Sequence, residues 1–108
     1  MSIRADLIRG HTDTIILARL LSGDSYGYEI NKAITALSGG QFELKEATLY
    51  TAFKRLEETG LICSYWGDET VGARRKYYHI TPAGAAAYRA LRQEWQDTRS
   101  IIDALLEE

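Results

Sequence analysis

The clearest pattern of apolar and polar positions lies in residues 46–58. Leu49, Phe53 and Leu56 recur at steps of four and three residues, as on one face of a helix. Gly60 follows where a helix C-terminus needs a residue that tolerates left-handed backbone. The sequence therefore predicts a short amphipathic helix. Its outer face carries hydrogen-bond donors, cations and one small residue: Ala47, Tyr50, Thr51, Lys54 and Arg55.

Residues 61–80 alternate with a period of two, which is typical of strands. We expect two strands joined by the polar tip 68–71, between Gly67 and Gly72. The alternation places Cys63 on a buried strand. The return strand begins with three successive cations, so the hairpin is a basic ribbon directly behind the amphipathic helix: Arg74, Arg75 and Lys76.

Two more helices are predicted upstream. Asp13 is positioned to cap a helix that runs to about Leu21, and the turn 22–25 supplies the cap of a second helix over about 26–37. Residues 41–44 form a short extended link that we expect to pair weakly with the hairpin. Three short helices followed by a ribbon favour a winged helix over a plain bundle. The second helix is expected to bury Ile30, Ala33, Ile34 and Leu37.

A long helix is predicted from Thr81 as N-cap and Pro82 as first residue to about Leu106. About 25 residues at ~1.5 Å each make a rod of about 37 Å, more than the rest of the chain can cover. A monomer would leave its seam in water, so we expect a homodimer. The seam recurs at heptad steps: Tyr88, Leu91, Trp95, Ile102 and Leu105.

The expected fold is α+β but mostly α: a winged helix-turn-helix with a long C-terminal dimerisation helix. Residues 1–80 would bind DNA, with the N-terminal helix contributing to the dimer, and residues 81–108 would dimerise. A helix with one apolar and one cationic face suits the major groove, and a basic ribbon suits the phosphate backbone. The partner is therefore double-stranded DNA, in the form of a pseudopalindromic operator.

Composition does not oppose this expectation. The net charge is −2, but residues from Glu94 onward hold five acids against Arg99 alone, so the first 93 residues carry +2. Screening limits each charge to a reach of about 8–10 Å, so local distribution decides. One cysteine among 108 residues excludes an internal disulfide and fits a reducing compartment. Without an apolar run of about 18 residues or a signal sequence, we expect a cytoplasmic protein that does not enter membranes.

Each DNA contact has a structural alternative. The cations of the helix could form an ordinary solvated face, and those of the ribbon a charged edge that prevents strand pairing. The competing function is a winged-helix protein-interaction module that binds no nucleic acid. We assign phosphate contacts to Arg74 and Arg75, and base reading to Tyr50 and Lys54. The candidate DNA-binding residues are Tyr28, Lys45, Thr48, Tyr50, Thr51, Lys54, Arg55, Arg74, Arg75 and Lys76.

Enzymatic function is not expected. His11, His79 and Cys63 lack metal-ligand spacing, and the chain contains no nucleophile motif or phosphate-cradling loop. Glu57 and Glu58 are adjacent on a helix and diverge. We therefore predict no catalytic residue, no metal and no cofactor.

The chain resembles the PadR family of bacterial transcriptional regulators over nearly its whole length. The single short C-terminal helix resembles that of the small subfamily, which includes multidrug-binding repressors. The resemblance implies a homodimeric winged-helix repressor that a small molecule releases from DNA. It rests on Tyr26–Ile30, Glu46–Tyr50, Lys54–Ile62, Ser64–Gly67, Arg74–Tyr78 and Thr81–Gly84.

The resemblance also implies a ligand site. In multidrug-binding members, paired copies of a last-helix tryptophan sandwich planar aromatic drugs, and Trp95 occupies the matching position. Arg92 stands where such members have an aromatic residue, and Arg99 where they have an acid. Arg99 should disfavour cationic drugs and favour neutral or anionic planar ligands. Other pore-facing positions align with Leu7, Thr14 and Ala18.

Overall fold

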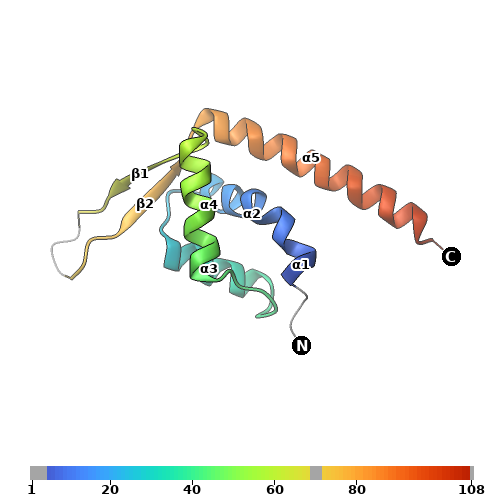
Figure 1. The fold of residues 1–108 in the computed structure, drawn as a ribbon, viewed down its shortest axis with the longest axis horizontal. Helices are drawn as coiled ribbons and strands as arrows, with labels where there is room; N and C mark the ends of the chain where they lie inside the picture. Colours follow the sequence, from blue (N-terminus) through green and yellow to red (C-terminus); the bar gives the residue numbers. More distant parts are fainter. Residues whose placement is uncertain (1–4, 69–71, 108) are drawn as a thin grey trace.

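The computed structural model describes residues 5–68 and 72–107. Its helices and strands follow the expected order, and a long helix runs past the other elements at one edge (Figure 1). The molecule is elongated, with extents of 59 × 34 × 21 Å. The elements are α1 (Ala5–Ile8), the 3-10 turn η1 (Arg9–His11), α2 (Thr12–Leu21), α3 (Gly27–Leu37), α4 (Glu46–Glu58), β1 (Ile62–Trp66), β2 (Lys76–Ile80) and α5 (Pro82–Leu105).

The core lies where α2, α3 and α4 meet the base of the hairpin. Phe53 stacks on Tyr78 with ring centroids 3.9 Å apart, which joins α4 to β2. The apolar stripe predicted on α4 is buried, as expected from its helical spacing. The buried apolar residues are Ile16, Leu17, Leu20, Ile30, Ile34, Leu44, Leu49, Ala52, Phe53, Leu56, Ile62 and Tyr78.

Within the described residues, β1 and β2 form a two-stranded antiparallel sheet in which Ile62 pairs with Ile80 and Trp66 with Lys76. The expectation that residues 41–44 pair with this hairpin is wrong. Leu44 is held instead by Asn31, whose side chain donates to the Leu44 carbonyl (2.7 Å) and accepts from its N–H (2.9 Å). An isolated bridge joins the hairpin to Ser25, which pairs with Tyr78.

The start of α5 matches the prediction. The Thr81 side chain accepts a hydrogen bond from the Gly84 N–H at 3.0 Å, and Pro82 occupies the first turn. Gly84 packs directly on the end of α4's connection to β1, because a Cβ there would lie 2.0 Å from the Leu61 carbonyl oxygen. The helix is therefore joined tightly to the winged domain at its first turn.

Local expectations fail at four positions. Asp13 is not a cap, because η1 leads directly into α2 and His11 occupies the N-cap position. The turn before α3 also supplies no side-chain cap, since Tyr26 is the N-cap and Ser25 donates to Glu29 instead. Leu37 ends α3 on its outer side and is 70% exposed. Cys63 is exposed, because β1 turns Ile62 and Ser64 inward.

Candidate nucleic-acid interface

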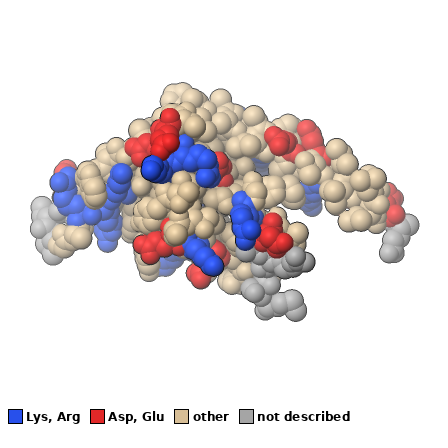
Figure 2. Space-filling view, in the orientation of Figure 1, with Lys and Arg blue, Asp and Glu red and all other residues tan. Residues whose placement is uncertain are grey.

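The outer face of α4 is open to solvent. Burial of Leu49, Phe53 and Leu56 turns the opposite side of the helix outward. Tyr50 is 46% exposed and the Arg55 side chain 51% exposed. Lysine and arginine gather over α4 and, separately, over the hairpin on the same side of the molecule (Figure 2). The exposed α4 positions are Glu46, Ala47, Thr48, Tyr50, Thr51, Lys54, Arg55 and Glu58, and Lys45 precedes the helix as its exposed N-cap residue.

Tyr50 is seated between α4 and the start of α3. Its ring meets Phe53 edge-on with centroids 5.6 Å apart. A Cβ at Gly27 would lie 2.7 Å from the Tyr50 hydroxyl oxygen, so only glycine leaves that place open. Tyr28, in the first turn of α3, is 71% exposed beside this contact and lines the same shallow hollow as Tyr50. The two tyrosines are brought together from separate helices.

Arg55 has a partner that the sequence did not reveal. Its guanidinium donates two hydrogen bonds to the Asp13 carboxylate, one from Nε at 3.3 Å and one from Nη2. The bond to Asp13 raises the pKa of Arg55 further above its usual value. The pair joins α2 to α4 and holds the guanidinium at the edge of the exposed face. Asp13 thus orients a candidate DNA-binding side chain.

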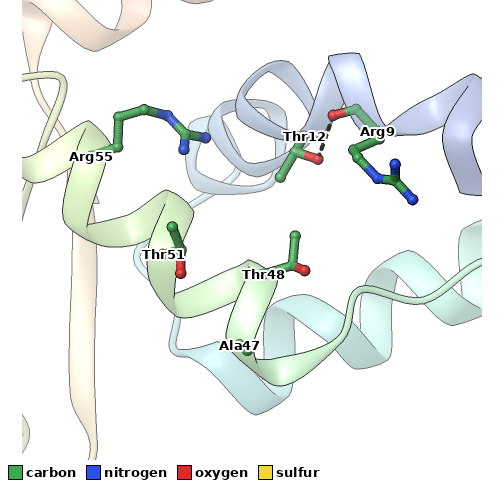
Figure 3. A pocket seen from close by; sticks show the side chains of 6 residues that line it. All are labelled: Arg9, Thr12, Ala47, Thr48, Thr51 and Arg55. Atoms are coloured by element: carbon green, nitrogen blue, oxygen red, sulfur yellow. Dashed lines mark hydrogen bonds between the residues drawn. The ribbon is translucent and has the colours of Figure 1, made fainter.

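Beside this pair, a hollow separates the start of α2 from α4 (Figure 3). We call it the α2–α4 hollow, with a volume of about 360 Å³. The Thr12 hydroxyl donates to the Arg9 carbonyl at 2.9 Å, which fixes the backbone that carries Arg9. The described residues that line the hollow are Arg9, Thr12, Ala47, Thr48, Thr51 and Arg55.

The three cations of the hairpin are exposed but each has a neighbour. Arg74 donates from Nε to the Gly67 carbonyl at 3.0 Å across the hairpin. The Arg75 guanidinium lies 4.9 Å from the centre of the Tyr26 ring, and the Lys76 ammonium 5.8 Å from that of Tyr78. Arg75 and Lys76, which are adjacent in the chain, therefore lie against different tyrosines. Residues 69–71 of the expected polar tip lie outside the described residues.

Asp24 links both strands of the hairpin to the turn before α3. The Tyr65 hydroxyl donates to one carboxylate oxygen at 2.6 Å, and His79 Nδ1 lies 2.7 Å from the other. Both contacts lower the pKa of Asp24, and the hydrogen bond from Tyr65 has the larger effect. The same hydrogen bond raises the pKa of Tyr65 to about 12. Tyr77 stacks on Tyr65 with centroids 5.7 Å apart. The hairpin is thereby held in a set orientation to α3.

The candidate ligand residues lie along α5 and the N-terminal helices. Trp95 is 44% exposed, and His11 meets it edge-on with centroids 4.9 Å apart. Leu7 is 65% exposed. The Arg99 Nε lies 3.8 Å from a carboxylate oxygen of Asp103, one helical turn later. Among the remaining candidates, Thr14 and Ala18 are half-buried and Arg92 is exposed.

The described residues contain neither a membrane-spanning helix nor a metal-binding cluster. None of the helices there is long and apolar enough to cross a membrane. The same residues contain no group of three or more His, Cys, Asp and Glu side chains arranged to hold a metal ion.

Comparison with known proteins supplies the family. A model of the PadR-like family of transcriptional regulators matches residues 16–90. An uncharacterised protein of Lysinibacillus sphaericus is 47% identical over 105 residues, which are 97% of this chain and 96% of that protein. A transcriptional regulator from Clostridium thermocellum has a similar structure, with a TM-score of 0.89 and 48% identity over 97% of this chain and 99% of its own.

A PadR family transcription regulator from Clostridium difficile matches with a TM-score of 0.76 and 38% identity, covering 89% of this chain and 98% of its own. The matched residues 16–90 include α4, the hairpin and the first turns of α5. The exposed cationic face of α4 and the basic hairpin therefore lie in the part of the chain that the family model covers. This chain belongs to the PadR-like family of transcriptional regulators, a membership that supports DNA binding as its mode of action.

Proposed function

We propose that the protein is a homodimeric repressor that reads a pseudopalindromic operator. The observation that carries the proposal is the exposed outer face of α4, with hydroxyls and cations flanked by the basic hairpin. Such a face enters the major groove, and the hairpin lies along the phosphate backbone. Within this arrangement Tyr50 and Lys54 read bases, while Arg74 and Arg75 contact phosphates.

Dimerisation through residues 81–108 follows from the apolar surface that α5 leaves uncovered. Trp95, Ile102 and Leu105 are 44%, 48% and 74% exposed in one chain. Water-exposed apolar side chains in register along one helix are stabilised by burial against a second copy. A two-fold dimer would place two copies of α4 in major grooves about one turn, or about 34 Å, apart.

The same dimer axis would bring two Trp95 side chains near each other, which is the basis for a planar aromatic effector. Filling the space between them would rotate the two winged domains and change the spacing of the two copies of α4. Arg99 disfavours cationic ligands there, although Asp103 at 3.8 Å offsets part of its charge. Leu7, Thr14, Ala18 and Arg92 complete the proposed pocket.

Selection of duplexes from a random library, followed by gel shifts over a range of salt concentrations, tests operator binding. A repressor of this kind should enrich a two-fold-symmetric sequence and lose affinity steeply as salt rises. Failure to enrich any sequence, together with salt-independent retention of a protein partner, would favour the protein-interaction module instead.

The effector is tested separately by titration of tryptophan fluorescence in a Trp66→Phe variant, in which Trp95 is the remaining tryptophan. A flavin-like anion and a planar cationic dye are compared on the same protein. Stronger quenching at lower concentration is expected for the anion, and tighter binding of the cation would contradict the role given to Arg99.

A further inference from the structure

The exposed face of α4 has two flanks, and they differ in charge. The flank toward the hairpin is lined from α4 by Tyr50, Lys54, Glu57 and Glu58, and from β2 by Lys76 and Tyr78. The other flank is the α2–α4 hollow, lined from α4 by Ala47, Thr48, Thr51 and Arg55. At 100° per residue Thr48, Thr51 and Arg55 lie on one side of the outward direction and Tyr50, Lys54 and Glu57 on the other, with Ala47 and Glu58 close to the outward direction itself. The described lining of the hairpin flank includes two acids, whereas that of the hollow is cationic and hydroxylic.

The chemistry of the α2–α4 hollow is that of an oxyanion site. In Figure 3 Arg55 and Arg9 lie at the two ends of the gap, with Thr48 and Thr51 along its lower edge. The Arg55 side chain extends toward α2, whereas the guanidinium of Arg9 points away from Arg55. Guanidinium forks match tetrahedral oxyanions, and threonine hydroxyls add neutral donors. The volume of about 360 Å³ leaves room for a phosphate group.

The ion pair with Asp13 does not remove Arg55 from this role. A guanidinium has five N–H donors, and the two bonds to Asp13 use two of them. The bonds also hold the remaining donors in one orientation, which lowers the conformational entropy lost on binding. Asp13 neutralises Arg55 in part, so Arg9, which forms no ion pair with any residue that the structure describes, supplies the charge that would attract an anion.

We propose that the α2–α4 hollow binds a backbone phosphate of DNA, with Arg9 as its principal cation. This rests on the proposed function. A helix in the major groove, which is about 12 Å wide, has a row of phosphates on each side. The hairpin serves the row on one flank of α4, and the hollow faces the row on the other. The recognition helix is then held between two phosphate contacts, one from the hairpin and one from Arg9 in η1, which precedes α2.

Salt-dependent binding to the selected operator duplex tests the role of Arg9. Arg9→Ala should weaken binding. It should also reduce the slope of log affinity against log salt concentration by about 0.9 in magnitude, because one phosphate contact is lost. Arg9→Lys keeps the charge and should retain the slope. Arg89→Ala removes an exposed arginine of α5 and should change neither quantity. Thermal unfolding checks that each variant folds, which is expected because Arg9 is exposed.

The outcomes separate this inference from the proposed function. If the wild-type protein binds the duplex and Arg9→Ala matches Arg89→Ala, the hollow is not a DNA contact and the repressor proposal stands. If the wild-type protein selects no duplex, both fail. Titration with inorganic phosphate, followed by the amide resonances of Thr48 and Thr51, tests the other source of the oxyanion. Phosphate binding that requires Arg9, with an unchanged DNA salt slope, would assign the hollow to a free anion and overturn the DNA contact.

Discussion

The helix α4 and the C-terminal half of α5 both face solvent in one chain, but they expose opposite chemistry. α4 buries its whole apolar stripe in its own domain and exposes hydroxyls and cations. α5 packs Tyr88 and Leu91 against the core, and beyond them its apolar positions become more exposed, reaching 74% at Leu105. A polar face on a fully packed helix is suited to a polyanion, whereas an apolar stripe without cover is suited to another copy of itself.

The largest effect is expected from disrupting the exposed stripe of α5. Ile102→Glu combined with Leu105→Glu should convert a dimer into monomers, because each buried Leu or Ile contributes about 1.5–3 kcal/mol and each is present twice. The dissociation constant should rise by at least about 100-fold. Sedimentation measures the association, and circular dichroism should show that the winged domain remains folded.

Gln96→Glu, at another exposed position of α5, is the matched control. It should leave the dimer intact, since residue 96 is outside the heptad seam. Equal dissociation in both variants would mean that added negative charge, rather than loss of the apolar stripe, separates the chains.

The next largest effect, on the free energy of unfolding, is expected where the first turn of α5 packs against the connection between α4 and β1. Gly84→Ala puts a Cβ against the Leu61 carbonyl oxygen, where the space is only 2.0 Å. Forced displacement of backbone at a packed site costs about 1–3 kcal/mol. Urea unfolding at matched protein concentration measures the loss. Gly10→Ala, where the added Cβ meets nothing within 4 Å, should cost far less.

A smaller effect, confined to the face of α4, is expected from Lys54→Ala. If Lys54 reads a base, its loss should reduce discrimination between the selected operator and a scrambled duplex by about 1–3 kcal/mol, without altering the stability of the protein.

Arg74→Ala should instead weaken binding to both duplexes alike and reduce the salt slope by about one unit. Competition binding with the two duplexes separates these roles, and equal loss on both duplexes for Lys54→Ala would make Lys54 a phosphate contact.

The smallest effect concerns the contact that orients the hairpin. Because Tyr65 and His79 lower the pKa of Asp24, the folded protein gains stability above the usual carboxyl pKa of 3.8, and loses it as the pH falls through the lowered value. Asp24→Asn should therefore lower the melting temperature slightly at pH 7 and not at the acid end. A constant difference at every pH would contradict the ionic origin. The raised pKa of Tyr65, about 12, adds stability that is lost only as the pH rises through that value.

Sequence patterns predicted most of the architecture, because most of its helices and strands depend on the spacing of residues that are close in the chain. The stripe of α4, the strands of the hairpin and the Thr81 cap each follow from spacing within a few residues. Expectations failed where a distant group intervened. Asp13 is bonded to Arg55, 42 residues away, rather than capping a helix, and Leu44 is bonded to Asn31 rather than to the hairpin.

The candidate DNA-binding residues of α4 and the hairpin were likewise visible from residue type and spacing. The role proposed for Arg9 was not visible, because an arginine in this mixed N-terminal segment belongs to no periodic pattern. Only the packing of α2 across α4 places it beside Thr48 and Thr51. The same holds for Gly27, whose importance to Tyr50 arises from the crossing of α3 and α4.

By itself the sequence determined the apolar stripe of α4, the two strands of the hairpin, the N-terminus of α5, and that a polar, cationic face had to remain outside. These are properties of neighbours in the chain. The tertiary structure decided which side chains meet across elements: Arg55 with Asp13, Asp24 with both strands, and Arg9 with the flank of α4. Such contacts depend on how helices cross, and crossing is set by the summed packing of the whole core rather than by any local pattern.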